Sequence, residues 1–190
     1  MKFLKKFINW FINKTFSSLR LKKNQSLLFK NYFIRGAENK KIINMVNKFK
    51  KFSMTGESRM FSLCQAVRHV NSLKLKGDFV ECGVWKGGNL LLLNRLKNYY
   101  NLNKSIYGYD TFEGMTPPSN NDHDYNNISA KHLLENKNLH QKKNIWCYAS
   151  LEEVKNYIKK YAKSNSIKLI KGPVEKTLLK KKICLNRYRY

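Results

Sequence analysis

Short runs of apolar residues alternate with amphipathic segments through the middle of the chain. Such runs at 78–84 and 105–109 predict buried β-strands, and further extended segments are expected at 144–149, at 167–170 and from Ile183 onward. The amphipathic segments between these runs predict helices. Strands that alternate with helices form βαβ units and a parallel sheet, and the low strand count predicts an incomplete Rossmann-like sheet.

The same pattern predicts where helices begin. Apolar residues recur on one helical face after Thr55, whose hydroxyl is expected to cap that helix. A leucine-rich helix is expected after the first strand, and a short helix at about 129–138. Ser150, followed closely by two glutamates, is expected to cap a helix that runs to about Lys163.

The first 50 residues are far more basic than the middle of the chain. They hold 13 Lys and Arg and one acid, whereas residues 51–170 hold 18 basic and 10 acidic residues. An apolar stripe beside lysines predicts a helix over 1–20, packed on its own domain or resting weakly on an anionic membrane surface; the stripe consists of Leu4, Phe7, Ile8 and Phe11. We therefore expect a basic, mostly helical extension (1–50) before an α/β domain (51–190).

Composition limits the class of protein. A chain of 190 residues with 42% hydrophobic residues fits one globular domain, and no apolar stretch reaches the roughly 20 residues that a membrane-spanning helix needs. Four cysteines without a CxxC pair or zinc spacing predict a reduced, cytoplasmic protein. The net charge of +26 has two explanations, an A/T-rich genome that favours lysine codons or a phosphate-rich partner.

Three predicted strand ends carry residues suited to a nucleoside. Glu81 and Gly83 follow the first strand in a G-x-x-x-G-G turn, which lets backbone approach a ligand but is not the dinucleotide pattern GxGxxG. Asp110 ends the second strand, where an acid can accept both hydroxyls of a ribose. Ser150 follows the expected strand at 144–149, where a hydroxyl can flank a base. Together they predict a nucleoside pocket without a pyrophosphate cradle.

Two longer motifs resemble the macrocin O-methyltransferase family, GDFVECGVWKGG at 77–88 and YDTFEGMTP at 109–117. The resemblance extends to TGESR at 55–59, WCYASLEEV at 146–154 and KGPVEKTL at 171–178, and so covers about 51–185. Both long motifs are more specific than a generic glycine-rich turn.

This resemblance implies an S-adenosylmethionine-dependent, metal-dependent sugar O-methyltransferase with a class I methyltransferase fold. It implies that Glu81 and Gly83 line the methionine end of the cofactor, that Asp110 holds the ribose and that Ser150 lies beside the adenine. The implied partner is a sugar-containing small molecule or a polysaccharide precursor, and Mg²⁺ is expected for intact relatives. No catalytic residue is identified.

The end of the chain departs from the family pattern. In the family, aspartates on and beyond the strand that begins at Ile183 bind the metal and serve as base, but residues 186–190 read NRYRY and no acid follows Glu175. Asp122 and Asp124 lie in a polar loop, where we expect solvation rather than metal binding. We therefore expect a C-terminally truncated domain, natural or frameshifted, that lacks the metal ligands and is inactive.

Two other functions stay open from the sequence alone. The basic extension could make the chain a membrane-surface or nucleic-acid-binding protein, although no RRM or KH signature is present and nucleic acid is not the expected partner. A nicotinamide-binding Rossmann domain is the other alternative, and the absence of GxGxxG counts against it.

Overall fold

The computed structural model describes residues 37–124, 126–135, 146–162 and 166–178. The chain divides into two units, Met1–Asn44 and Met45–Tyr190, which we describe separately. The described part of the first unit is the beginning of helix α3 (Ala37–Phe49), which crosses the boundary.

Several expectations fall on residues outside the described ranges. These are the helix expected over 1–20, with its membrane contact, and the strand expected from Ile183. The functional division expected at residue 50 stays a prediction.

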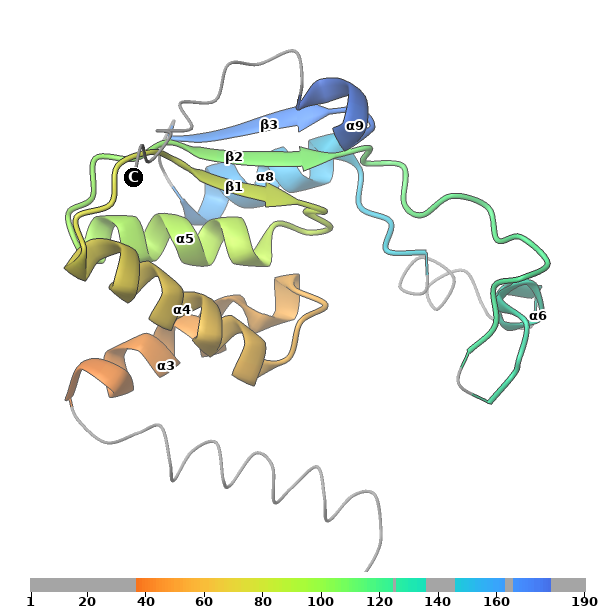
Figure 1. Cartoon of the computed structure of the whole chain (residues 1–190), viewed down its shortest axis with the longest axis horizontal. Helices are drawn as coiled ribbons and strands as arrows, with labels where there is room; N and C mark the ends of the chain where they lie inside the picture. Colours follow the sequence, from red (N-terminus) through yellow and green to blue (C-terminus); the bar gives the residue numbers. More distant parts are fainter. Residues whose placement is uncertain (1–36, 125, 136–145, 163–165, 179–190) are drawn as a thin grey trace, which may run out of the picture. The chain divides into compact units, whose positions relative to one another are not determined.

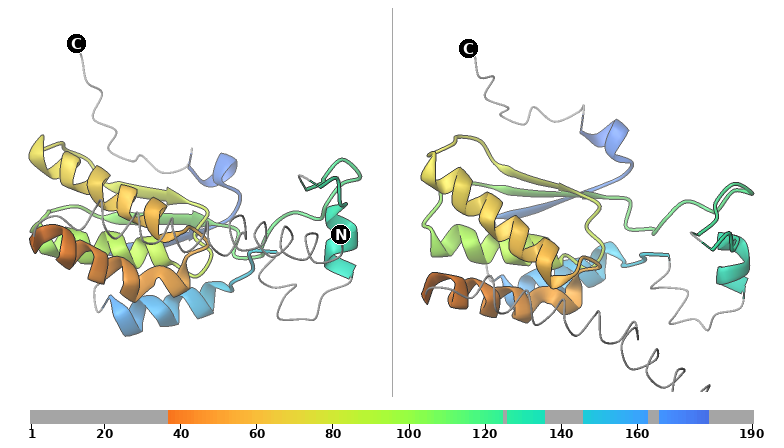
Figure 2. Two further views of the ribbon diagram at one scale, coloured as in Figure 1. Left: turned by 90° about the horizontal axis from the view of Figure 1, so that it is seen from below. Right: turned by 60° about the horizontal axis from the view of Figure 1, so that its bottom comes forward.

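Three parallel strands form the sheet of the second unit, in the order β1 (Phe79–Cys82), β2 (Ile106–Asp110) and β3 (Ile167–Lys171). The connections between them contain α5 (Gly88–Tyr99) and α8 (Leu151–Tyr161), and Figures 1 and 2 show both helices on the same face of the sheet. Successive right-handed crossovers from β1 to β2 and from β2 to β3 place both connecting helices on the same face of the sheet. The incomplete Rossmann-like α/β sheet predicted from the sequence is confirmed.

Close packing of α5 on β2 forms the centre of the core. Five leucines of α5 are buried: Leu90, Leu91, Leu92, Leu93 and Leu96. Gly108 permits this approach, since a Cβ there would lie 2.6 Å from Leu90 Cδ1 and 2.9 Å from Val84 Cγ2. Core packing at this density leaves no room for an added methyl group, so Gly108 fixes the distance between helix and sheet.

The buried Asn94 ties α5 to the start of β3. Its side-chain nitrogen donates to the carbonyl of Ala162 at 3.4 Å, and its oxygen accepts from the hydroxyl of Ser166 at 2.9 Å. Buried polar groups need such partners. Asn94 therefore fixes the return of the chain from α8 into the sheet.

A capping residue was predicted for two helices, Ser150 for one and Thr55 for the other, and the prediction for Thr55 was wrong. Ser150 caps α8 as expected, because its hydroxyl accepts the backbone N–H of Glu153 at 3.1 Å. Helix α4 (Glu57–Ser72) is instead capped by Gly56, without a side-chain cap. The hydroxyl of Thr55 lies 2.7 Å from that of Ser53 and is thereby diverted from the helix end.

The strand expected at 144–149 is not present in its described part. Residues 146–149 form a turn followed by irregular chain, and Cys147 has a φ of 50°, in the left-handed region that a β-strand excludes. The third strand of the sheet is Ile167–Lys171, which the sequence placed fourth among the extended segments.

A long excursion separates β2 from α8. Figure 1 shows residues 111–124 leaving the carboxyl end of β2, with the short helix α6 (Ala130–Glu135) beyond that end. The excursion thus adds chain to the edge of the sheet where ligands of parallel α/β folds bind. Within the described ranges, no helix combines the length and apolar character needed to cross a membrane.

Candidate cofactor site

A cavity of about 560 Å³ opens at the carboxyl ends of the strands. We call it the strand-end cavity. Its walls come from the segment before α4, the loop after β1, the start of α5, the end of β2 with the loop that follows, Cys147, and the loop after β3 with the short helix α9 (Val174–Thr177). A volume of this size is typical of small-molecule and cofactor sites.

Gly88 brings the segment before α4 to this cavity. A Cβ at Gly88 would lie 2.6 Å from the backbone carbon of Phe52 and 2.8 Å from the nitrogen of Ser53. The ring of Phe52 packs against Tyr157 and Tyr161 of α8, with centroid distances of 4.8 and 5.2 Å. Residues 52–53 are therefore held directly over the first turn of α5.

A chain of hydrogen bonds connects this segment to β1. The hydroxyl of Ser53 donates to the side-chain oxygen of Asn89 at 3.4 Å, and the side-chain nitrogen of Asn89 donates to Glu81 Oε1 at 2.9 Å. Because Asn89 is bonded on both sides, the orientation of its amide and of the Glu81 carboxylate is fixed.

Glu81 is a largely buried carboxyl with one oxygen unused. Burial raises its pKa from 4.5 to about 7, the hydrogen bond from Asn89 opposes this increase, and the nearby charge of Asp110 adds to it. Glu81 Oε2 is buried and has no hydrogen-bond partner within the described structure. A buried polar atom without a partner is costly, so this oxygen marks a place where a ligand can donate a hydrogen bond.

The loop after β1 is held open beside Glu81. Gly83 has a φ of 88°, and nothing lies within 4 Å of the position that a Cβ would occupy. Val84 and Trp85 donate backbone N–H groups to Asp110 Oδ2 at 2.6 and 3.1 Å, and Asp110 Oδ1 accepts from Phe112 at 2.7 Å. Asp110 thus positions both strand-end loops around the cavity.

Two more residues of the cavity wall have buried polar atoms without a partner in the described part of the chain. These are Trp85 Nε1 and the hydroxyl of Tyr109. With Glu81 Oε2, the cavity wall therefore offers one acceptor and two further hydrogen-bonding groups to a ligand.

The sequence-predicted site is assembled in part. Glu81, Gly83 and Asp110 all line the strand-end cavity. Ser150 is absent from its described lining, and its hydroxyl serves as the helix cap of α8. The carboxyl end of the third strand is formed instead by Gly172 and the residues that follow it, and these do line the cavity.

Sequence reasoning missed two parts of this wall. The loop after β3 was marked only by Gly172-Pro173 after an apolar run, and Gly172 donates its N–H to the carbonyl of Asp110 at 2.9 Å. Ser53 and Asn89 had no local signal beyond a polar side chain beside the glycine pair. Their contact depends on a close approach of segments 36 residues apart.

The described residues contain no group of three or more His, Cys, Asp or Glu side chains arranged to hold a metal ion. Asp122 and Asp124 are used within their loop. Asp122 Oδ2 accepts from the backbone nitrogen and the hydroxyl of Ser119, which lowers the Asp122 pKa, and Asp124 Oδ1 accepts from Asn126 and Ile128. We therefore derive no catalytic step through a metal.

Comparison with known families identifies the family of the chain. The macrocin O-methyltransferase family, TylF, matches residues 14–185. The chain belongs to this family. The sequence motifs of this macrocin O-methyltransferase family member indicated a resemblance that begins at about residue 51. The family match begins well before that residue and so includes much of the basic extension.

The solved structure of one O-methyltransferase shares the fold of this chain. The O-methyltransferase NovP aligns with a TM-score of 0.54 and 25% identity, over 70% of this chain and 52% of NovP. CalS11, described as a calicheamicin methyltransferase, aligns with a TM-score of 0.41 and 16% identity, over 79% of this chain and 64% of CalS11. The chain of this family member thus spans about half the length of NovP. A comparison with curated proteins gave no significant match.

Proposed function

We propose that this chain carries the cofactor-binding part of an S-adenosylmethionine-dependent O-methyltransferase, with the strand-end cavity as the cofactor site. The observation that carries the proposal is the Glu81 carboxylate. It is largely buried, is oriented by Asn89, and leaves its buried Oε2 without a partner in the described structure, at the wall of a cavity of about 560 Å³. The amino group of the methionine moiety is a cation that supplies the missing donor.

The residues of the cavity fit the other parts of this cofactor. Gly83 leaves room for a ligand to lie directly on the backbone, because nothing fills its Cβ position. Asp110 is the proposed ribose ligand; its carboxylate accepts three backbone N–H groups and has capacity for one more donor. No GxGxxG turn is present for a pyrophosphate, which favours S-adenosylmethionine over a dinucleotide.

For the contact with the adenine we propose a different segment from Ser150, the residue predicted from the sequence. The loop after β3, with Gly172 and Pro173, lines the strand-end cavity, whereas Ser150 is not in its described lining. We propose that this loop contacts the base. In a parallel sheet the ends of adjacent strands share one ligand, and β3 lies next to β2.

The proposed reaction transfers a methyl group to a sugar hydroxyl, as the family resemblance implies. The cofactor supplies an electrophilic methyl group on its sulfonium. The described residues bind and orient the donor through Glu81, Gly83 and Asp110, and such positioning is a major source of rate acceleration in group transfer. The base that takes the hydroxyl proton is not assigned.

Calorimetric titration with S-adenosylhomocysteine tests the proposal. We expect the wild-type chain to bind it and Glu81→Ala to bind at least ten-fold more weakly, since the charge-assisted contact is lost. Glu152→Ala is the matched control, because Glu152 is an exposed acid in the first turn of α8. Equal affinity in the wild type and Glu81→Ala would rule out the assigned role of Glu81, and absence of binding by the wild type would rule out the cofactor.

A further inference from the structure

Exposed lysines lie on the short 3-10 helix η1 (Lys50–Phe52) and along helix α8. Aromatic packing joins these two elements, because the ring centroid of Phe52 lies 4.8 Å from that of Tyr157 and 5.2 Å from that of Tyr161. We call the exposed lysines of the two elements that form no ion pair the lysine patch. Its members are Lys51, Lys155, Lys159 and Lys160.

Two lysines of the patch are held on one aromatic ring. The Nζ atom of Lys51 lies 6.0 Å from the ring centroid of Tyr161, and that of Lys160 lies 5.5 Å from the same centroid. A cation over the face of an aromatic ring is attracted to it, which restrains the long side chain. The Tyr161 ring therefore keeps two positive charges close to one another at the surface.

No acid neutralises the patch within the described part of the chain. The nearby acids are engaged elsewhere, since Glu57 pairs with Lys50 and Glu153 accepts the hydroxyl of Tyr157 at 2.8 Å. Glu152 lies in the first turn of α8 and forms no ion pair with a patch lysine in the described structure. Two of the lysines also stand four residues apart on α8, where like charges repel. An anionic partner would relieve this repulsion.

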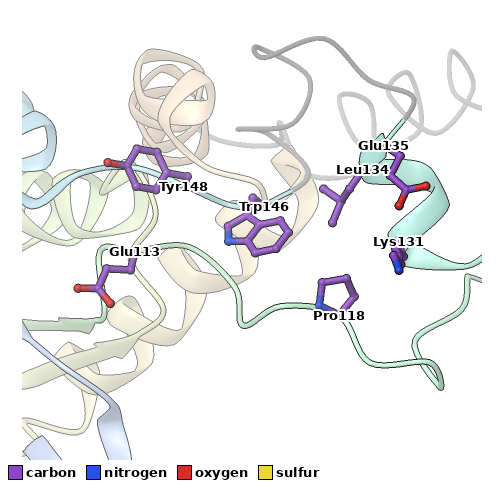
Figure 3. Close-up of a pocket in the computed structure, with 7 residues that line it drawn as sticks. All are labelled: Glu113, Pro118, Lys131, Leu134, Glu135, Trp146 and Tyr148. Atoms are coloured by element: carbon purple, nitrogen blue, oxygen red, sulfur yellow. The ribbon is translucent and has the colours of Figure 1, made fainter.

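The two cavities described do not account for this positive charge. Besides the strand-end cavity, a pocket of about 540 Å³ lies between the loop after β2, helix α6 and the segment that leads into α8 (Figure 3). Its charged residues are two acids and one lysine, Glu113, Glu135 and Lys131, so it offers an anion no excess of positive charge. The described lining of the strand-end cavity contains no lysine or arginine. An anionic partner is therefore better matched by the exposed helical surface of the patch.

The spread of the patch favours a broad anionic surface over a single small anion. Small molecules are bound by groups that converge in a concave site. The patch lysines are instead exposed along a helix and a neighbouring turn, and so are distributed over convex surface. The head groups of anionic phospholipids form a broad negative surface, and each lysine near it adds to binding.

The aromatic ring within the patch favours a membrane over a nucleic acid. Proteins that bind single-stranded nucleic acid stack the bases on open aromatic rings. The Tyr161 ring is already in contact with Phe52 and with the ammonium groups of Lys51 and Lys160, so it is no open platform for a base. Tyrosine and lysine with apolar bodies and polar tips are typical of the interface between membrane and water.

We propose that the lysine patch docks this protein on membranes that contain anionic phospholipids. The contact is electrostatic, between the lysine ammonium groups and the phosphate head groups, and it is separate from the contact expected of residues 1–20. The inference does not depend on the proposed methyl transfer, because no patch residue is in the described lining of the strand-end cavity.

Vesicle sedimentation of the full chain at about 0.1 M salt tests the proposal, since charges within about 10 Å still interact at that ionic strength. The probes are vesicles of phosphatidylcholine alone and of equal parts phosphatidylcholine and phosphatidylglycerol. We expect the wild type to bind the anionic vesicles far more tightly than the neutral ones. Lys51→Gln combined with Lys160→Gln should weaken this binding about 25-fold, because each lysine near such a surface contributes about five-fold.

Two further double variants separate the patch from net charge. Lys76 is exposed in the loop after α4, and Lys131 is exposed on α6, so Lys76→Gln with Lys131→Gln removes the same charge elsewhere. This control should lose less than about five-fold in vesicle affinity. Lys51→Arg with Lys160→Arg keeps both charges and should bind as the wild type does. All variants retain residues 1–50, and thermal unfolding followed by circular dichroism verifies that each is folded.

Several results would overturn the proposal. The wild type must not bind neutral and anionic vesicles equally, nor fail to bind both. Equal weakening in the patch and control variants would show that net charge alone accounts for binding. Duplex and single-stranded DNA, titrated with the same variants, test the other class of anionic partner. A patch variant that loses DNA affinity while its vesicle binding stays at the wild-type level would assign the patch to nucleic acid and overturn the membrane contact.

Discussion

Asp110 accepts a hydrogen bond from the backbone nitrogen of Val84 at 2.6 Å, and so ties the end of β2 to the loop that follows β1. The same carboxylate oxygen accepts from Trp85, whose φ of 47° lies in the left-handed region. A residue with a side chain is disfavoured there, and the surrounding structure must hold it. Asp110 therefore shapes the proposed cofactor site in addition to its proposed contact with the ribose.

Replacing Asp110 should affect both stability and binding. In Asp110→Ala, three backbone N–H groups lose a charged acceptor, so we expect the free energy of unfolding to fall by on the order of 3 kcal/mol. Binding of S-adenosylhomocysteine should fall at least ten-fold. Urea unfolding and calorimetry measure the two effects. Asp122→Ala is the control, because the carboxylate of Asp122 accepts hydrogen bonds only within an exposed loop in the described structure. If Asp110→Ala is as stable as the wild type and binds S-adenosylhomocysteine with normal affinity, Asp110 neither supports the strand-end loops nor contacts the ribose.

Cofactor affinity should depend on pH through Glu81. Its pKa is raised to about 7 by burial, so the carboxyl is protonated below that pH and meets the cationic amino group only weakly. We expect the affinity for S-adenosylhomocysteine to rise as the pH increases from 6 to 8. Calorimetry across this range on wild type and Glu81→Gln tests the idea, because the variant should lose the rise. A flat profile in the wild type speaks against the ammonium contact.

The same carboxyl should limit stability at alkaline pH. The folded-state pKa lies above the unfolded value of 4.5, so the contribution of Glu81 to stability is fully present below pH 4.5 and is lost as the pH rises through about 7. Glu81→Gln removes a buried charge, and at pH 8 we expect it to raise the free energy of unfolding by on the order of 1–3 kcal/mol. Urea unfolding at pH 5 and pH 8 checks this. A variant less stable than the wild type at pH 8 would contradict the burial argument.

Gly88 should be intolerant of a side chain. In Gly88→Ala the added methyl group would lie 2.6 Å from the backbone of Phe52, so the 52–53 segment must move away from α5. We expect a loss of roughly 1–3 kcal/mol in the free energy of unfolding, with weaker cofactor binding because Ser53 no longer reaches Asn89. Gly56→Ala is the matched control, since nothing lies within 4 Å of its Cβ position. Equal stability of the two variants would argue against the close approach.

The sequence predicted those residues of the strand-end cavity that belong to the ends of adjacent parallel strands. Glu81 and Asp110 are placed by β1 and β2, whose order and direction follow from local apolar runs and the helix between them. Gly83 was likewise predictable, because a glycine that directly follows a strand indicates close backbone approach.

Other parts of the site depend on contacts that local patterns do not encode. The run at 144–149 has the aromatic and β-branched residues of a strand, but the left-handed backbone at Cys147 breaks it, and Ser150 consequently follows a turn. Thr55 was expected to cap α4, yet it bonds to Ser53. The pairing of Ser53 with Asn89 arises from the packing that Gly88 permits, which no spacing along the chain reveals.

The central claim is that the strand-end cavity binds the methyl donor, and a crystal structure of the chain with S-adenosylhomocysteine tests it most directly. The account predicts ligand density in this cavity, with the amino group in contact with Glu81 Oε2 and the ribose beside Asp110. Ligand bound elsewhere on the chain, or bound in the cavity with the amino group away from Glu81, would contradict it.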